Sequence, residues 1–214
     1  MKYNRQTPVY YENLNVMFHG IPKNASTTVK NALYELEHGQ SFDNDNKQWI
    51  HKGNEKGGSV YPPVEDILEG KYDTTFHFTV SRHPYSRFIS FYTDLVQRTA
   101  AHRFETPPFF RDNNIDLTNL SINEAIDLVC SYSDDDGDEH FVSQDSFIYV
   151  DECDYIHMET LGRDWKQLCR QIFVDPIPLT RYNKSNGTIE LDEEQKIKLY
   201  NRYILDFKRF RYER

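Results

Sequence analysis

The chain has 214 residues, of which 38% are hydrophobic and 28% charged, and its formal charge is −9 at pH 7. This length suits one well-buried core, so we predict a single domain over residues 1–214. The acidic total argues against a general nucleic-acid binder, whose surface should be basic, and no apolar run reaches the length of a membrane span. The three cysteines form no C-x-x-C pair and the N-terminus lacks a signal-peptide core, which predicts a cytoplasmic protein with reduced, mostly buried thiols and no zinc site.

The first predicted strand covers residues 16–19 and leads through a short loop into an amphipathic helix. The loop contains one cation, Lys23, and three hydroxyl residues follow it at the start of the helix, namely Ser26, Thr27 and Thr28. The first N–H groups of a helix lack intrahelical partners and carry the positive end of its dipole. We therefore expect this junction to bind an anion.

The loop differs from a Walker motif. Lys23 follows Gly20 by three positions, without a second glycine before the lysine and without a Gly-Lys-Ser/Thr run. The backbone wrap expected around a nucleotide triphosphate and its magnesium is therefore missing, and a smaller terminal phosphate fits better.

A second junction of the same kind follows the predicted strand at residues 74–81. Arg82 ends this strand, and Pro84 suits the first turn of the next helix, where its missing N–H needs no partner. Ser90 lies two helical turns further on, on a polar stripe that also contains Ser86, Thr93 and Gln97. Arg82 is suited to a bidentate grip on phosphate, with Ser90 as a further donor.

The other predicted elements are, in chain order, a long loop at 38–58, a helix from the Ser121 and Glu124 capping box to Cys130, strands at 147–150 and 155–158, a helix around Trp165, and one C-terminal helix from Leu191. This alternation predicts an α/β fold with three layers, in which helices flank a mostly parallel central sheet. Ligands of such sheets bind beyond the carboxyl ends of the strands. Both junctions lie at such ends, which suggests one ligand with two separated phosphates.

Both junctions resemble motifs of one enzyme family. The run Ile21-Pro22-Lys23-Asn24-Ala25-Ser26-Thr27-Thr28 resembles the loop that binds the 5′-phosphosulfate in sulfotransferases that use 3′-phosphoadenosine 5′-phosphosulfate (PAPS). The run from Val80 to Tyr92 resembles their 3′-phosphate motif, including the arginine at Arg82 and the serine at Ser90. The similarity is closest to the Golgi-type carbohydrate sulfotransferases and their microbial relatives. Residues 140–144 are similar to a family His-x-x-Pro-Gln segment, with Ser143 in the place of proline.

The resemblance implies a P-loop-like nucleotide-binding fold and transfer of a sulfuryl group from PAPS to a hydroxyl or amine, with a carbohydrate as the acceptor class, adenosine 3′,5′-bisphosphate as product and no metal. Lys23 would neutralise the leaving phosphate. The predicted cofactor-binding residues are Lys23, Asn24, Ala25, Ser26, Thr27, Thr28, Arg82, Ser90 and Lys184. Lys184 belongs to this set because its Asn-Lys-Ser-Asn-Gly segment is turn-forming and places a cation near backbone donors.

The predicted general base is His51, in the long loop between the two motifs, where relatives often carry a catalytic histidine or glutamate. An imidazole of ordinary pKa, about 6.5, accepts a proton at neutral pH. The rival residues are Glu35, Glu37 and His140. His19 and His77 lie in apolar strands, and we interpret both as core residues with satisfied hydrogen bonds.

The acidic run at 134–139 does not have calcium-loop spacing, since Tyr132 stands where the first acidic ligand would be needed. We expect a solvated acidic loop, with a recognition surface for a cationic acceptor as the alternative. Two other functions stay open at this point: a nucleotide-kinase-like phosphotransferase, and a non-catalytic protein that keeps only the nucleotide cradle.

Overall fold

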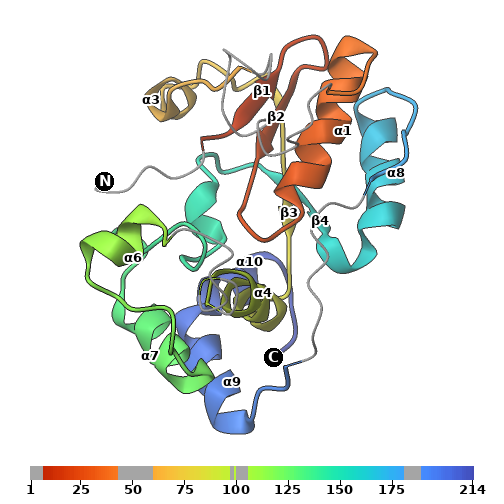
Figure 1. Cartoon of the computed structure of the whole chain (residues 1–214). Coiled ribbons are helices and arrows are strands. Elements are labelled where there is room, and N and C mark those ends of the chain that lie inside the picture. The colour runs from red at the N-terminus through yellow and green to blue at the C-terminus, as the bar shows by residue number, and fades with distance from the viewer. Residues whose placement is uncertain (1–6, 43–59, 97–98, 100–105, 181–188) are drawn as a thin grey trace. The chain divides into compact units, whose positions relative to one another are not determined.

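The computed structural model describes residues 7–42, 60–96, 99, 106–180 and 189–214 (Figure 1). These residues fall into two compact units. The sheet unit comprises the described residues of Gln6–Arg82 and Phe147–Asn183, and the helical unit comprises those of His83–Ser146 and Lys184–Arg214. The single domain over residues 1–214 stays a prediction.

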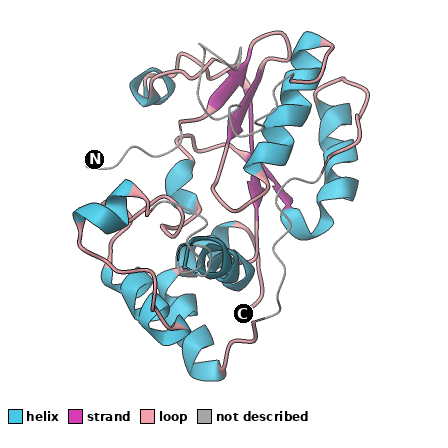
Figure 2. Cartoon of the chain, in the orientation of Figure 1, coloured by secondary structure: helices cyan, strands magenta, loops and turns pink. Residues whose placement is uncertain are grey.

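The sheet unit is built on four strands in the spatial order β1 (Val9–Tyr11), β2 (Val16–His19), β3 (Phe76–Ser81) and β4 (Asp154–His157). β2, β3 and β4 run parallel, whereas β1 pairs antiparallel with β2 (Figure 2). The predicted α/β class with a mostly parallel sheet flanked by helices is confirmed. The strand predicted at 147–150 is wrong, because Phe147 ends a 3-10 turn (η3, Asp145–Phe147) and its carbonyl faces the His19 side chain at 3.2 Å instead of a neighbouring strand.

One face of the sheet is apolar and is covered by α1 (Ser26–His38) and α8 (Leu161–Gln171), which lie alongside the strands in Figure 1. The buried side chains of this core are Val9, Tyr11, Val16, Phe18, Val29, Ala32, Leu33, Phe78, Val80, Ile156, Trp165, Leu168 and Cys169. Trp165 satisfies its indole N–H on the carbonyl of Ile177 at 3.1 Å. Burying a side chain of this size contributes about 1.5–3 kcal/mol, so this face stabilises the sheet unit and fixes its strand register.

Because strand residues alternate between the two faces, the polar side chains of β2 and β3 lie on the opposite face. These side chains are nevertheless buried. His19 and His77 approach each other there, with 3.0 Å between Nε2 of His19 and Nδ1 of His77. The outer nitrogen of His77 meets the carbonyl of Tyr72 at 3.0 Å. The interpretation of both histidines as core residues with satisfied hydrogen bonds is confirmed.

The sheet unit also contains a short helix, α3 (Val64–Leu68), and a 3-10 turn, η4 (Met158–Thr160). In its described residues the helical unit contains helices and loops but no strand (Figure 2). Its elements are α4 (Pro84–Phe91), the π-helical turn η2 (Tyr92–Val96), α6 (Pro108–Asp112), α7 (Ile122–Ser131), α9 (Glu193–Arg202) and α10 (Ile204–Arg209). The capping box predicted at Ser121 and Glu124 is present.

One of two helix predictions in this unit is wrong in detail. Regular α-helix ends at Phe91, where η2 begins, and Ser90 is buried, but Gln97 lies outside the described residues, so the polar stripe from Ser86 onward stays a prediction. The C-terminal helix is broken at Tyr203, which leaves helical geometry at φ −112° and ψ 25°. The buried side chain of Tyr203 donates a hydrogen bond to the carbonyl of Phe141 at 2.7 Å, at the point where the two helices meet.

The expectation of mostly buried thiols is also wrong: Cys169 is buried, whereas Cys153 is partly exposed and Cys130 exposed. None of the three, all of which lie in the described residues, forms a disulfide. Within those residues, no helix has the length and apolar character needed to cross a membrane.

Candidate functional site

The loop between β2 and α1 has an unusual backbone. Lys23 and Ala25 both adopt left-handed conformations, with φ of 72° and 57°. For residues with a side chain this conformation costs about 1–2 kcal/mol each, and neither position is glycine. Alternating right- and left-handed residues turn successive N–H groups toward one concavity, which is the backbone geometry of many anion sites. Strain of this kind concentrates at ligand-binding sites.

The start of α1 follows this loop directly. Ser26 and Thr28 are buried and Thr27 is partly buried, so the hydroxyl residues predicted to follow the loop stand at the helix start. The first turn of α1 contains no acidic residue. A negative charge placed here would therefore meet the positive end of the helix dipole without a competing carboxylate from that turn.

Hydrogen bonds from β3 and the residue after it hold this loop within the sheet unit. The side chain of Thr79 donates to the carbonyl of His19 at 2.6 Å, at the end of β2. The side-chain amide of Asn24 donates to the carbonyl of Val80 at 2.8 Å, and Asn24 is almost completely buried. Asn24 thus turns its amide nitrogen toward β3, and its predicted role in cofactor binding stays a prediction.

Arg82 and Lys23, the cations of the two predicted junctions, lie together. Nη1 of Arg82 donates to the backbone carbonyl of Lys23 at 2.9 Å. Arg82 follows β3 directly, and both residues are partly buried. Ser90, the predicted partner of Arg82, lies in α4 of the helical unit, so the pairing of Arg82 with Ser90 stays a prediction.

Two of the rival base candidates, Glu37 and Glu35, form hydrogen bonds within the sheet unit. The carboxylate of Glu37 accepts the backbone N–H groups of Asn13 and Leu14 at 3.0 and 3.2 Å, which gives it a structural role. Glu35 accepts a hydrogen bond from the Ser41 hydroxyl at 3.1 Å on the surface. His51 and Lys184 lie outside the described residues, so their roles stay predictions.

His140 is oriented by Asp138. Its Nδ1 lies 2.6 Å from Oδ1 of Asp138, and the same oxygen accepts the backbone N–H of His140 at 3.0 Å. Asp138 is buried, whereas the His140 side chain is partly exposed. A carboxylate at Nδ1 favours the tautomer whose lone pair is on Nε2, as in the histidines of acid–base catalysis.

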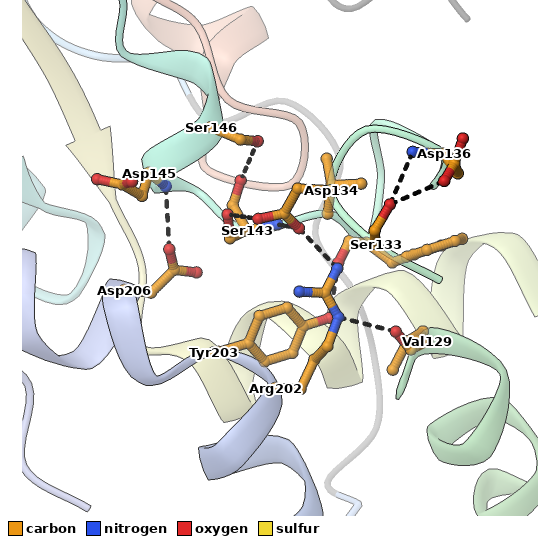
Figure 3. Close-up of polar contacts among 12 residues, drawn as sticks. Val129, Ser133, Asp134, Asp136, Ser143, Asp145, Ser146, Arg202, Tyr203 and Asp206 are labelled. Carbon is orange, nitrogen blue, oxygen red and sulfur yellow. Dashed lines mark hydrogen bonds and ion pairs between the residues drawn. The ribbon is translucent and has the colours of Figure 1, made fainter. Parts of the chain in front are cut away.

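The loop around His140 is held by side chains that the sequence reasoning missed (Figure 3). Asp134 bonds to the backbone N–H and hydroxyl of Ser143 and forms an ion pair with Arg202 at 2.7 Å. The buried guanidinium of Arg87 donates to the carbonyls of Val142 and Glu139, at 2.6 and 3.2 Å. Burial lowers the pKa of Arg87. Its sequence position gives no signal of this role, because an arginine on an amphipathic helix normally faces water.

These contacts also change the interpretation of the acidic run. Asp134 and Asp138 fold inward and bond to the chain, so the expectation of a wholly solvated loop is wrong for these two residues. Among the residues that the structure describes, no group of three or more His, Cys, Asp or Glu side chains is arranged to hold a metal ion.

A model of the sulfotransferase family matches residues 9–213, a span that includes both units and both loop motifs. No curated protein and no solved structure matches the chain. Because the family model covers nearly the whole sequence, the chain belongs to the sulfotransferase family.

Proposed function

We propose that this protein is a PAPS-dependent sulfotransferase that transfers the sulfuryl group to a hydroxyl or amine of a carbohydrate acceptor. Membership of the sulfotransferase family supports sulfuryl transfer in general. The observation that carries the choice of donor is the backbone of the Lys23 loop. Its two left-handed residues flank Asn24 at the carboxyl end of a parallel strand, where such sheets bind ligands.

The residues present fit the 5′-phosphosulfate of this donor. A helix start with hydroxyl side chains, the first backbone N–H groups of that helix and a nearby lysine are the donors that a phosphate-sized anion needs. The loop is too poor in glycine for a wrapped triphosphate, which favours PAPS over the nucleotide-kinase alternative.

When bound, PAPS would supply a sulfuryl group attached to its 5′-phosphate. The leaving group is adenosine 3′,5′-bisphosphate, which keeps this phosphate. Lys23 neutralises the negative charge that grows on this phosphate, helped by the hydroxyl groups of Ser26, Thr27 and Thr28. Arg82, Ser90 and Lys184 hold the rest of the nucleotide, so that positioning adds to electrostatic stabilisation.

The acceptor must also lose a proton. We assign this step to His51, as the sequence predicts, with His140 as the second candidate. The observation in favour of His140 is its short hydrogen bond to the buried carboxylate of Asp138, which orients the ring.

Transfer of labelled sulfate from PAPS into carbohydrates tests this proposal. Wild-type protein should label a product from a carbohydrate panel or a host extract, and Lys23→Ala should reduce the rate about 100-fold or more, as expected when a charge-stabilising group is lost. Lys71→Ala is the matched control, because Lys71 is an exposed lysine that pairs with Asp66 and Glu69. Tight nucleotide binding without any labelled product would favour the non-catalytic alternative.

A further inference from the structure

The loop that we assign to the 5′-phosphosulfate is shaped from β3 and the arginine that follows it. Three residues of this segment, Thr79, Val80 and Arg82, each form a hydrogen bond with one residue at or after the end of β2. The contacts are Thr79 Oγ1 to the His19 carbonyl at 2.6 Å, Asn24 Nδ2 to the Val80 carbonyl at 2.8 Å, and Arg82 Nη1 to the Lys23 carbonyl at 2.9 Å. All six residues belong to the sheet unit.

Two of these hydrogen bonds, those of Thr79 and Asn24, are buried where water does not easily replace them, and the bond from Arg82 to Lys23 is partly buried. Thr79 and His19 are completely buried, and Asn24 is 1% exposed. When one partner of a buried hydrogen bond is removed, the other loses its bond and gains none from solvent. Asn24 therefore acts as a positioning residue, which fixes the loop to β3 through the carbonyl of Val80.

The peptide group between Lys23 and Asn24 is held at both ends. Its carbonyl accepts from Arg82, and its N–H donates to the carbonyl of Ile21 at 3.2 Å. The orientation of this peptide fixes the backbone on the C-terminal side of Lys23. Lys23 has a left-handed conformation, with φ of 72°, which an L-residue keeps only when its surroundings impose it. The Arg82 guanidinium is thus part of what shapes the Lys23 loop.

We infer that Arg82 is shared between the two phosphate sites, so that binding at one is coupled to binding at the other. The inference rests on the proposed function, which assigns the same guanidinium to the 3′-phosphate. Arginine suits this double task because its planar head carries five N–H donors in a fixed fork. A 3′-phosphate that orders Arg82 also orders the carbonyl of Lys23, and by reciprocity an occupied Lys23 loop strengthens the 3′-phosphate site.

Adenosine 5′-monophosphate separates this role from simple 3′-phosphate binding, because it lacks the 3′-phosphate. An arginine that contacts only the 3′-phosphate would not influence its affinity, apart from a weak charge effect. We expect Arg82→Met and the charge-neutral Asn24→Ala to weaken binding of this nucleotide about fivefold to tenfold in calorimetry, the equivalent of one ordinary hydrogen bond. Arg111→Met, on an exposed arginine of α6, should leave the affinity unchanged.

A second measurement needs no nucleotide. In the unliganded protein, NMR backbone chemical shifts and HN–Hα couplings at Lys23 and Ala25 should report left-handed geometry, and both should move in Arg82→Met and Asn24→Ala but not in Arg111→Met. Thermal unfolding confirms that each variant is folded before it is compared.

An unchanged affinity for adenosine 5′-monophosphate in both Arg82→Met and Asn24→Ala overturns the coupling, whatever the NMR signals show. If wild-type protein binds neither this nucleotide nor adenosine 3′,5′-bisphosphate, the proposed function fails and the coupling fails with it. In that case the unliganded NMR signals still decide whether Arg82 shapes the loop.

Discussion

Asp206 accepts the backbone N–H of Gln144 on Oδ2 at 2.9 Å, inside the helical unit. Its other oxygen accepts the backbone N–H of Asp145 at 3.0 Å (Figure 3). Asp206 is completely buried, and this burial raises its pKa from 3.8 to about 6, although these hydrogen bonds and the nearby charge of Arg87 act in the opposite direction. The residue therefore links the stability of the helical unit to pH.

The sign of this link can be measured with Asp206→Asn. Between pH 4 and 6 the folded protein keeps a proton on Asp206 that the unfolded chain has lost, so this contribution to the free energy of unfolding falls as the pH rises through about 6. The free energy of unfolding of the wild type minus that of Asp206→Asn should fall by about 3 kcal/mol from pH 4 to pH 7. Urea denaturation at several pH values gives this difference, and one that grows with pH would contradict the assignment.

Asp134 should show the opposite slope. Burial raises its pKa, but hydrogen bonds from Ser143 and the charge of Arg202 outweigh burial and hold the pKa below its usual range. Its stabilising contribution is present at neutral pH and is lost as the pH falls below about 4. Asp134→Asn should therefore be most destabilising at pH 7 and progressively less so in acid. The same urea series checks this. If the free energy of unfolding of Asp134→Asn changed with pH in parallel with that of the wild type, Asp134 would not contribute to the pH dependence of stability.

The elements that the sequence predicts well are those with local signals. The capping box of α7 needs only Ser121 and Glu124, and the apolar spacing of α1 needs only its own residues. The break at Tyr203 depends on a hydrogen bond to Phe141, far away in the sequence, and no local pattern encodes it. β1 has three residues, too few to give a periodic signal.

The candidate site divides in the same way. The Lys23 loop and Arg82 are recognisable because their residue types follow strands in the pattern of anion sites. The left-handed backbone at Lys23 and Ala25 is not predictable from residues that normally avoid it. It depends on contacts such as the one from Asn24 to Val80, which join segments distant in the sequence.

Another left-handed residue, Phe173, provides a test of backbone strain away from the site. It follows the end of α8 with φ of 59° and is 96% exposed, so its ring contributes almost no packing. The backbone N–H groups of Phe173 and Val174 bond to the carbonyls of Arg170 and Cys169, the helix-ending pattern that favours glycine. Phe173→Gly should raise the free energy of unfolding by about 1 kcal/mol.

Phe173→Ala is the control for this substitution. Alanine removes the exposed ring but keeps a Cβ atom, so it should give little or no gain in urea denaturation. Equal effects of the glycine and alanine variants would mean that the backbone at this position is not strained.

The choice of base can be settled by comparing His51→Asn with His140→Asn. If His51 takes the proton, its variant should lose about 10²–10⁴-fold in kcat with little change in nucleotide affinity, and the acid limb of the pH–rate profile should disappear. His140→Asn and Asp138→Asn should then keep most of the rate. The reverse result, with Asp138→Asn following His140→Asn, would transfer the role to the Asp138–His140 pair.

Calorimetric binding of adenosine 3′,5′-bisphosphate tests the central claim most directly, because it requires no knowledge of the acceptor. We expect binding by wild-type protein without magnesium, strong weakening in Lys23→Ala and Arg82→Met, and no effect of Lys71→Ala. Magnesium-dependent binding of ATP that is tighter than binding of the bisphosphate, or bisphosphate binding that is unchanged in Lys23→Ala, would contradict the central claim.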